Sequence, residues 1–121
     1  MSEYIEANRR AWNAAAPAHA RHEFGRLLEA VQGPAYNCLD EAATGILKRV
    51  GLAGKAVAQL CCNNGRELLS MKTLGAGRCV GFDVADAFIE QARRLAAAGG
   101  FDCEFVRADV YAIPSAYDGA F

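Results

Sequence analysis

The sequence lacks long hydrophobic runs and an excess of charge of either sign. Its 121 residues carry 13 basic and 14 acidic side chains, which gives a formal net charge of −1. Because non-specific nucleic-acid binding requires clustered positive charge, a nucleic-acid partner is not indicated. No apolar run approaches the length of a membrane span, and residues 1–4 lack the basic start of a signal peptide. We therefore expect a cytoplasmic protein with no membrane segment.

The sequence also lacks the cysteine spacing of a metal site. No C-x-x-C pair occurs among its five cysteines, which are Cys38, Cys61, Cys62, Cys79 and Cys103. Cysteines in apolar runs behave as small hydrophobic residues, so we expect reduced, buried thiols in a reducing compartment. His19 and His22 lie three residues apart, but no third ligand accompanies them. We therefore predict solvent-facing histidines and no metal centre.

Residues 1–53 show helical periodicity and no strand-like alternation. The clearest helix is predicted over residues 36–50, whose apolar side chains fall on one helical face. That face consists of Leu39, Ala43, Ile46, Leu47 and Val50. Gly51 is expected to end this helix, and Gly33-Pro34 separates it from an earlier helical segment. We interpret residues 1–53 as a helical cap region.

From residue 54 onward, short apolar runs alternate with helical segments. The runs cover residues 56–61, 79–82 and 103–106, and residues 117–121 resemble the start of a fourth run. Helices are predicted between them, over residues 65–74 and 86–98. Strands that alternate with helices of this length predict βαβ units and a parallel sheet buried on both faces. The predicted fold class is α/β, with a Rossmann-like parallel sheet of strands one to three and the start of strand four, preceded by N-terminal helices.

Polar residues follow three successive predicted strands, at the sheet edge where open α/β proteins bind ligands. Residues 61–65 lead into a helix that Asn64 and Glu67 can start with a capping box, and free amides there favour an anionic group. Asp83 follows this loop by roughly the spacing (about 20 residues) at which an acidic residue accepts ribose hydroxyls. Asp109 follows the third strand. The combination predicts a ligand site at this edge.

Each of these residues also has a simpler explanation. Asp83 can cap the next helix, although Asp86 is the better candidate for that cap and would leave Asp83 free. Asp109, taken alone, is better explained as a loop carboxylate that faces water. A turn between a strand and a helix is common, so residues 61–65 alone indicate little. The prediction of a site depends on all three strand ends together.

Four blocks of the sequence resemble class I S-adenosylmethionine-dependent methyltransferases. Residues 57–65, VAQLCCNNG, are similar to the family's first motif, V-L-D-L-G-C-G-x-G. Residues 80–85, VGFDVA, resemble the second-strand motif V-G-x-D-[IV]-S. Residues 105–118 contain FVRADV, then IP and YD, and are similar to F-x-x-x-D-x-x-x-[LI]-P followed by F-D. Residues 8–13, NRRAWN, resemble an N-terminal helix that some subfamilies fold over the cofactor.

The resemblance implies S-adenosyl-L-methionine as the cofactor and assigns a role to matching positions. Asp83 would bind the ribose hydroxyls, and Asp109 with the backbone of Val110 would bind the adenine edge. Residues 61–65 would wrap the methionine part, and Trp12 would cover the site, with a buried core tryptophan as the alternative. The cofactor-binding residues that it implies are Trp12, Gln59, Cys61, Cys62, Asn63, Gly65, Asp83, Val84, Asp109 and Val110.

The first motif departs from the family pattern at three positions. Cys61 and Asn63 replace glycines, and Gln59 replaces an aspartate. Glycine permits positive φ, which asparagine also tolerates, whereas a cysteine side chain can crowd the ligand. Gln59 keeps an acceptor but loses the negative charge. We therefore expect binding that is weakened but retained.

The family resemblance also implies a seven-stranded sheet, of which this sequence supplies three strands and the start of a fourth. We therefore expect residues 1–121 to form a single, truncated methyltransferase-like domain, with a helical cap region at 1–53 and a βαβαβ cofactor-binding core at 54–121. No catalytic residue is assigned, and the methyl acceptor is unidentified. An unpaired central strand and bare apolar faces around Val57, Leu60, Val80 and Phe82 predict self-association or a complementing segment.

Two other functions compete with a methyltransferase. A dinucleotide-binding oxidoreductase domain would have G-x-G-x-x-G in the first loop, but Leu68 occupies the position of the third glycine. A non-catalytic S-adenosylmethionine-binding fragment is the other alternative. Cofactor titration distinguishes the first of these from a methyltransferase, and an activity assay distinguishes the second.

Overall fold

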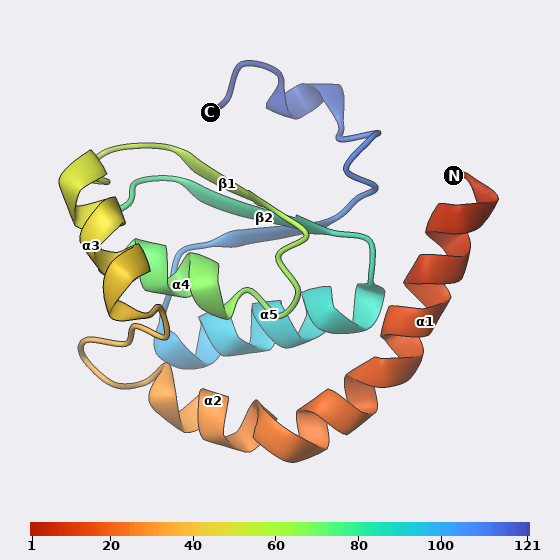
Figure 1. Ribbon diagram of the computed structural model, residues 1–121, viewed down its shortest axis with the longest axis horizontal. Coiled ribbons are helices and arrows are strands. Elements are labelled where there is room, and N and C mark those ends of the chain that lie inside the picture. The colour runs from red at the N-terminus through yellow and green to blue at the C-terminus, as the bar shows by residue number, and fades with distance from the viewer.

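The structure is a computed structural model that describes residues 1–121, and it centres on a parallel sheet (Figure 1). The strands are β1 (Val57–Leu60), β2 (Cys79–Asp83) and β3 (Glu104–Arg107), in the order β1-β2-β3. Helices α4 (Arg66–Thr73) and α5 (Asp86–Gly99) connect them and cover one face. The predicted α/β class and the predicted parallel sheet are confirmed.

The central strand β2 is buried along most of its length. Val57 of β1 pairs with Cys79, and Val80 pairs with Glu104 of β3. The covering helices contribute fully buried side chains because their apolar residues recur every three or four positions. These side chains include Leu68, Leu69, Ile89, Ala92 and Leu95. The helix predicted over residues 86–98 is therefore confirmed, and it ends at Gly100, which adopts the left-handed conformation of a typical C-cap.

The N-terminal helices form a curved arm around the open side of α5 (Figure 1). α1 (Glu3–His19) begins at Ser2, whose side chain accepts from the N–H of Ile5. It continues through a π-helical turn (Ala20–Phe24) into α2 (Gly25–Ala30). No helix in the chain combines the length and the apolar character needed to cross a bilayer.

The helix predicted over residues 36–50 begins later, as α3 (Glu41–Val50). Two side chains set this boundary. Asn37 accepts from the N–H of Leu39 at 2.9 Å in a local turn, and Asp40 accepts from the N–H of Ala43 at 2.7 Å as the N-cap. The predicted end at Gly51 is confirmed. The apolar face is only partly buried, since Ile46 is 52% and Val50 56% exposed.

Residues 117–121 do not form the start of a fourth strand, so this part of the prediction is wrong. A 3-10 helix (Ser115–Tyr117) and a turn at Gly119 occupy the segment. The rings of Tyr117 and Phe121 pack edge-on against Phe82 at 5.0 and 6.3 Å between centroids. Contacts of these rings with Phe82 take the place of strand pairing, and Phe121 remains 48% exposed.

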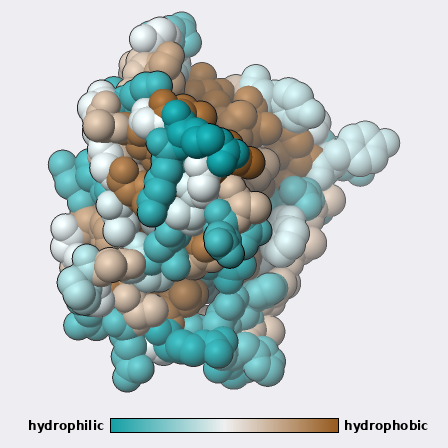
Figure 2. Space-filling view, turned by 60° about the vertical axis from the view of Figure 1, so that its left-hand side comes forward, coloured by the Kyte–Doolittle hydropathy of each residue, from teal (hydrophilic) through white to brown (hydrophobic).

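The C-terminal segment covers the sheet face opposite α4 and α5 (Figure 1). Val80 and Phe82 are therefore buried, contrary to the expectation of a bare face. β1 differs, because it pairs only with β2 and its Leu60 is 53% exposed. Figure 2 shows hydrophobic atoms gathered in the upper part of one side of the molecule, between charged side chains.

Candidate functional site

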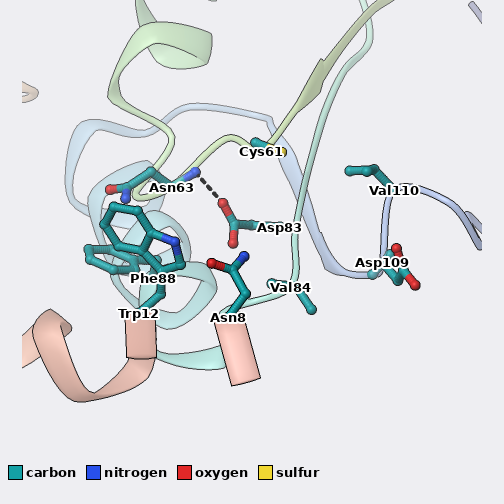
Figure 3. A pocket seen from close by; sticks show the side chains of 10 residues that line it. Asn8, Trp12, Cys61, Asn63, Asp83, Val84, Phe88, Asp109 and Val110 are labelled. Carbon is teal, nitrogen blue, oxygen red and sulfur yellow. Dashed lines mark hydrogen bonds between the residues drawn. The ribbon is translucent and has the colours of Figure 1, made fainter. Parts of the chain in front are cut away.

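A cavity of about 300 Å³ lies where the carboxyl ends of the strands meet α1 and α5 (Figure 3). It is lined by Asn8, Trp12, Cys61, Asn63, Asp83, Val84, Phe88, Ala108, Asp109 and Val110. Seven of these were predicted from the sequence, namely Trp12, Cys61, Asn63, Asp83, Val84, Asp109 and Val110. The structure thus brings together residues from α1 and from the loops after all three strands, at the edge where open α/β sheets bind ligands.

Asp83 ends β2, and its carboxylate accepts two backbone hydrogen bonds. Oδ2 accepts from the N–H of Asn63 at 2.7 Å (Figure 3), and Oδ1 accepts from the N–H of Ala85 at 2.9 Å. Ala85 is the N-cap of α5, so the expectation that Asp86 caps this helix and leaves Asp83 free is wrong. Each carboxylate oxygen has a second lone pair. Asp83 can therefore support both neighbouring segments and still accept a hydrogen bond from a ligand.

The loop after β1 has left-handed backbone at two residues that are not glycine. The φ angle is 54° at Cys61 and 53° at Asn63, the two positions where the family motif has glycine. The loop thus keeps the conformation that glycine permits. Asn63 supports it, because its Oδ1 accepts from the N–H of Asn64 at 2.7 Å. Both left-handed residues line the cavity.

Cys62 and Gly65 lie behind the cavity wall instead of lining it. Cys62 is fully buried, and burial together with the nearby charge of Asp83 raises the pKa of its thiol to about 12. Gly65 has a φ of 76°, and a Cβ there would lie 2.4 Å from the Phe105 ring. These two residues therefore serve the packing of the loop onto the sheet.

Two amide oxygens next to the loop are buried without a hydrogen-bond donor. They are Gln59 Oε1 and Asn64 Oδ1, and neither residue lines the cavity, although Gln59 was predicted as a site residue. The predicted capping box of Asn64 and Glu67 does not form, because α4 has Gly65 as its N-cap and Glu67 pairs with Arg66 at 3.2 Å. An unpaired buried acceptor destabilises a protein by about 1–3 kcal/mol. A ligand that donates hydrogen bonds here would remove that cost.

Asp86 holds α1 against the start of α5. Its carboxylate accepts from the guanidinium of Arg9 and from Nδ2 of Asn13, and it pairs with Arg107 at 3.2 Å. Asn13 also accepts from the N–H of Ala87 at 3.0 Å. Partial burial alone would raise the pKa of Asp86, but the hydrogen bonds from Arg9 and Asn13 and the charge of Arg107 lower the pKa overall.

Three lining residues were not predicted, and α1 supplies the most informative one. Asn8 lies one helical turn before Trp12, so helical spacing places both on the face of α1 that lines the cavity (Figure 3). That spacing was a usable signal. Trp12 is 44% exposed and packs edge-on against Phe88 with 6.1 Å between centroids, so it is not a core tryptophan. Phe88 lies on the buried apolar face of α5, and Ala108 carries no chemical signal.

Asp109 and Val110 form the far wall of the cavity (Figure 3). Oδ1 of Asp109 accepts from the N–H of Tyr111 at 2.9 Å, which fixes the turn after β3. The other carboxylate oxygen has no partner within the chain, and neither does the N–H of Val110. A hydrogen-bond acceptor and a donor therefore lie next to each other at this wall. Together, the parallel sheet and the cavity at its carboxyl edge are typical of Rossmann-like α/β ligand-binding proteins.

Comparison with known proteins gives the family. The family described as "Methyltransferase domain" matches residues 57–121, which is more than half of the chain. The chain therefore belongs to the class I S-adenosylmethionine-dependent methyltransferases, as its motifs indicated, and the family assignment replaces the dinucleotide oxidoreductase alternative. No curated protein sequence matches it.

Solved structures resemble parts of the chain. A crystal structure of a Thermoplasma acidophilum protein is 23% identical to this chain, with a TM-score of 0.53. The match covers 75% of this chain and 48% of the Thermoplasma chain, and it supports the fold. A structure described as "Conversion of a Disulfide Bond into a Thioacetal Group during Echinomycin Biosynthesis" is 33% identical, with a TM-score of 0.49, over 55% of this chain and 28% of that one. The chain thus spans less than half of either relative.

Proposed function

We propose that the cavity binds S-adenosylmethionine and that the chain is the cofactor-binding part of a methyltransferase. The observation that carries this proposal is the convergence of Asp83 and Asp109 on one cavity from the ends of adjacent strands. The free lone pairs of Asp83 would accept the ribose hydroxyls. The free carboxylate oxygen of Asp109 and the N–H of Val110 would bind the donor and acceptor edge of adenine.

The residues of the first loop fit the methionine part. Its ammonium group is a hydrogen-bond donor, and Gln59 Oε1 and Asn64 Oδ1 are buried acceptors that lack one. Neither residue lines the cavity in this structure, so the proposed contact requires these side chains to turn toward the ligand. Cys61 and Asn63 would contact the ligand through the cavity wall. The neutral amide of Gln59 attracts an ammonium less strongly than the family's aspartate, so we expect weaker binding than a charged residue would give.

α1 would cover the bound cofactor. Trp12 and Asn8 line the cavity from one face of this helix, and the Arg9–Asp86 pair and Asn13 hold the helix in place. When bound, the cofactor supplies a methyl group on a positively charged sulfur for transfer to an acceptor. This chain's residues contribute binding, orientation and exclusion of water, which are the main requirements for transfer to a good nucleophile.

Titration calorimetry with S-adenosylhomocysteine tests the proposed binding. Asp83→Asn and Asp109→Asn should each weaken binding by roughly 10- to 100-fold, because hydrogen bonds to a charged group contribute about 1.5–3 kcal/mol. Asp118→Asn, at an exposed carboxylate outside the cavity, is the matched control. Unchanged affinity in both cavity variants, or equal binding of NAD, would reject the proposal.

Thiol labelling gives an independent readout. Cys61 is exposed and lines the cavity, whereas Cys62 is fully buried. Iodoacetamide should label Cys61 and leave Cys62 unmodified, and saturating S-adenosylhomocysteine should protect Cys61. Absence of protection at saturation would place the ligand elsewhere.

A further inference from the structure

Cys79 and Cys103 lie side by side at the end of the sheet opposite the cofactor cavity. Cys79 is the first residue of β2, and Cys103 directly precedes β3. Because Val80 pairs with Glu104 in parallel register, the residues one step earlier, Cys79 and Cys103, also face each other. The cavity is at the carboxyl ends of these strands, so the cysteines are at their amino ends.

The placement of the two cysteines is compatible with a covalent bond. Neighbouring strands lie about 4.8 Å apart, within the range of about 4.4–6.8 Å between Cα atoms of a disulfide. In this register the two side chains point to the same face of the sheet, as paired residues of neighbouring strands do. Both are free, and Cys103 packs against the core cluster that contains Cys79. Since Cys103 lies just outside β3, its backbone can shift without disturbing the register of the sheet.

The surroundings of the pair favour a thiolate. A second cavity, of about 550 Å³, is lined by both cysteines together with Lys72, Gly77, Arg78, Asp102 and Glu104. Arg78 is paired with Glu104 at 3.2 Å, which leaves Lys72 as the cation that acts on the thiols.

The adjacent Cys103 thiol and the charge of Lys72 outweigh burial and lower the pKa of Cys79 to about 7, while the pKa of Cys103 is raised. At pH 7 about half of the molecules therefore carry one negative charge and one proton on this pair, a fraction that rises with pH.

A metal is not the natural partner of this pair. No group of three or more metal-binding side chains occurs in the chain, so the two sulfurs lack the further ligands that zinc requires. Two adjacent thiols, one of which ionises near neutral pH, are instead suited to thiol–disulfide exchange, whose rate depends on the thiolate fraction and on access.

We propose that Cys79 and Cys103 form a redox modification site that a low-molecular-weight disulfide, such as oxidised glutathione, converts into an intramolecular disulfide. Cys79 is only 1% exposed, so the half-buried Cys103 is the sulfur that the oxidant reaches. Cys103 first passes its proton to the neighbouring Cys79 thiolate. The Cys103 thiolate then attacks one sulfur of the oxidant, the S–S bond breaks, and a glutathione thiolate leaves. Cys79 then attacks the sulfur of Cys103, and the second glutathione leaves with the remaining proton. Two protein thiols are oxidised and one disulfide is reduced to two thiols.

Peptide mapping tests this proposal in a Cys38→Ser/Cys61→Ser background, which removes the two exposed thiols. The reduced protein is incubated in mixtures of oxidised and reduced glutathione, quenched with acid, alkylated and digested with trypsin. Cleavage after Arg78, Arg93 and Arg107 places Cys79 and Cys103 on separate peptides with one cysteine each. We expect the two peptides to become linked, with loss of two hydrogen atoms, and dithiothreitol to separate them.

Two variants sharpen the result. Cys103→Ser should abolish the linked peptide, while S-adenosylhomocysteine binding stays unchanged because the cavity is at the other edge of the sheet. Lys72→Gln should slow linkage severalfold near neutral pH. The proposal is overturned if both peptides stay unlinked, reduced or singly glutathionylated, at glutathione ratios that modify Cys61 in the unsubstituted protein.

Discussion

Cys61→Gly should stabilise the chain, although it removes a side chain. A left-handed backbone destabilises a residue that carries a Cβ by roughly 1–2 kcal/mol, and Cys61 has a φ of 54°. Glycine removes that strain but adds about 0.4–1 kcal/mol of entropy to the unfolded chain. Because the Cys61 side chain is exposed, little burial is lost. We expect a net gain of about 0.5–1 kcal/mol.

Asn63→Gly should have the opposite effect at a nearly identical φ of 53°. Asparagine tolerates the left-handed region, so glycine relieves little strain there. The substitution also removes the 2.7 Å hydrogen bond from the Asn64 N–H to Asn63 Oδ1, which contributes about 0.5–1.5 kcal/mol. With the entropy of glycine added, Asn63→Gly should destabilise the chain by roughly 1–2 kcal/mol.

Urea unfolding followed by circular dichroism measures both effects. Cys61→Ala is the control, because it removes the thiol but keeps the Cβ and therefore the strain, and it should change stability little. If Cys61→Gly and Cys61→Ala shift the midpoint equally, the effect belongs to the thiol. If Cys61→Gly destabilises as much as Asn63→Gly, the left-handed strain at Cys61 is absent and the reasoning fails.

Three further predictions follow from packing, charge and the sheet edge. Gly65→Ala should destabilise the chain by about 3 kcal/mol or more in urea unfolding, because the new Cβ would lie 2.4 Å from the Phe105 ring. Gly119 also has a positive φ but lies in open space, so Gly119→Ala should lower the free energy of unfolding by only about 1 kcal/mol. Because folding lowers the pKa of Asp86, its carboxylate stabilises the folded chain above the unfolded pKa of about 4, and this stabilisation is lost as the pH falls through the folded pKa. The fluorescence of Trp12, the single tryptophan, should report the release of α1 in this acid range. The same acid transition should be missing in Asp86→Asn. Light scattering should show that the chain associates through the free edge of β1. Leu60→Lys, on β1, should reduce this association, whereas Val50→Lys, on α3, should not. Equal effects of the two substitutions would exclude the β1 edge as the contact surface.

The strands and the two aspartates could be predicted because their signals are local. The apolar runs around Val57 and Val80 are short and bounded by helical segments, and Asp83 and Asp109 each follow a run directly. Parallel pairing then brings the strand ends together without further information. The predicted site therefore required only the correct order of strands and helices.

The remaining features depend on contacts between distant segments. Hydrogen bonds to the side chains of Asn37 and Asp40 set the start of α3. These bonds compete with a longer helix, and the apolar pattern of the sequence gives no sign of them. Residues 117–121 were expected to start a strand from their aromatic ends, but Asp118 and Gly119 disfavour a strand, and Tyr117 and Phe121 pack against Phe82 instead. Hydrogen bonds to the carboxylate of Asp86 dock α1, and this docking brings Asn8 to the cavity.

Asp83 explains how the first loop keeps its conformation without the family's glycines. Its carboxylate accepts the N–H of Asn63, so the charge at the end of β2 holds the left-handed turn that glycine would otherwise adopt more easily. The same carboxylate would bind the ribose, and stability and ligand binding are therefore coupled at this residue. Asp83→Ala would leave two backbone N–H groups without an acceptor, and a loss of binding in that variant would not identify the ribose contact. Asp83→Asn keeps one acceptor oxygen, and the comparison of its unfolding midpoint with its affinity separates the two roles.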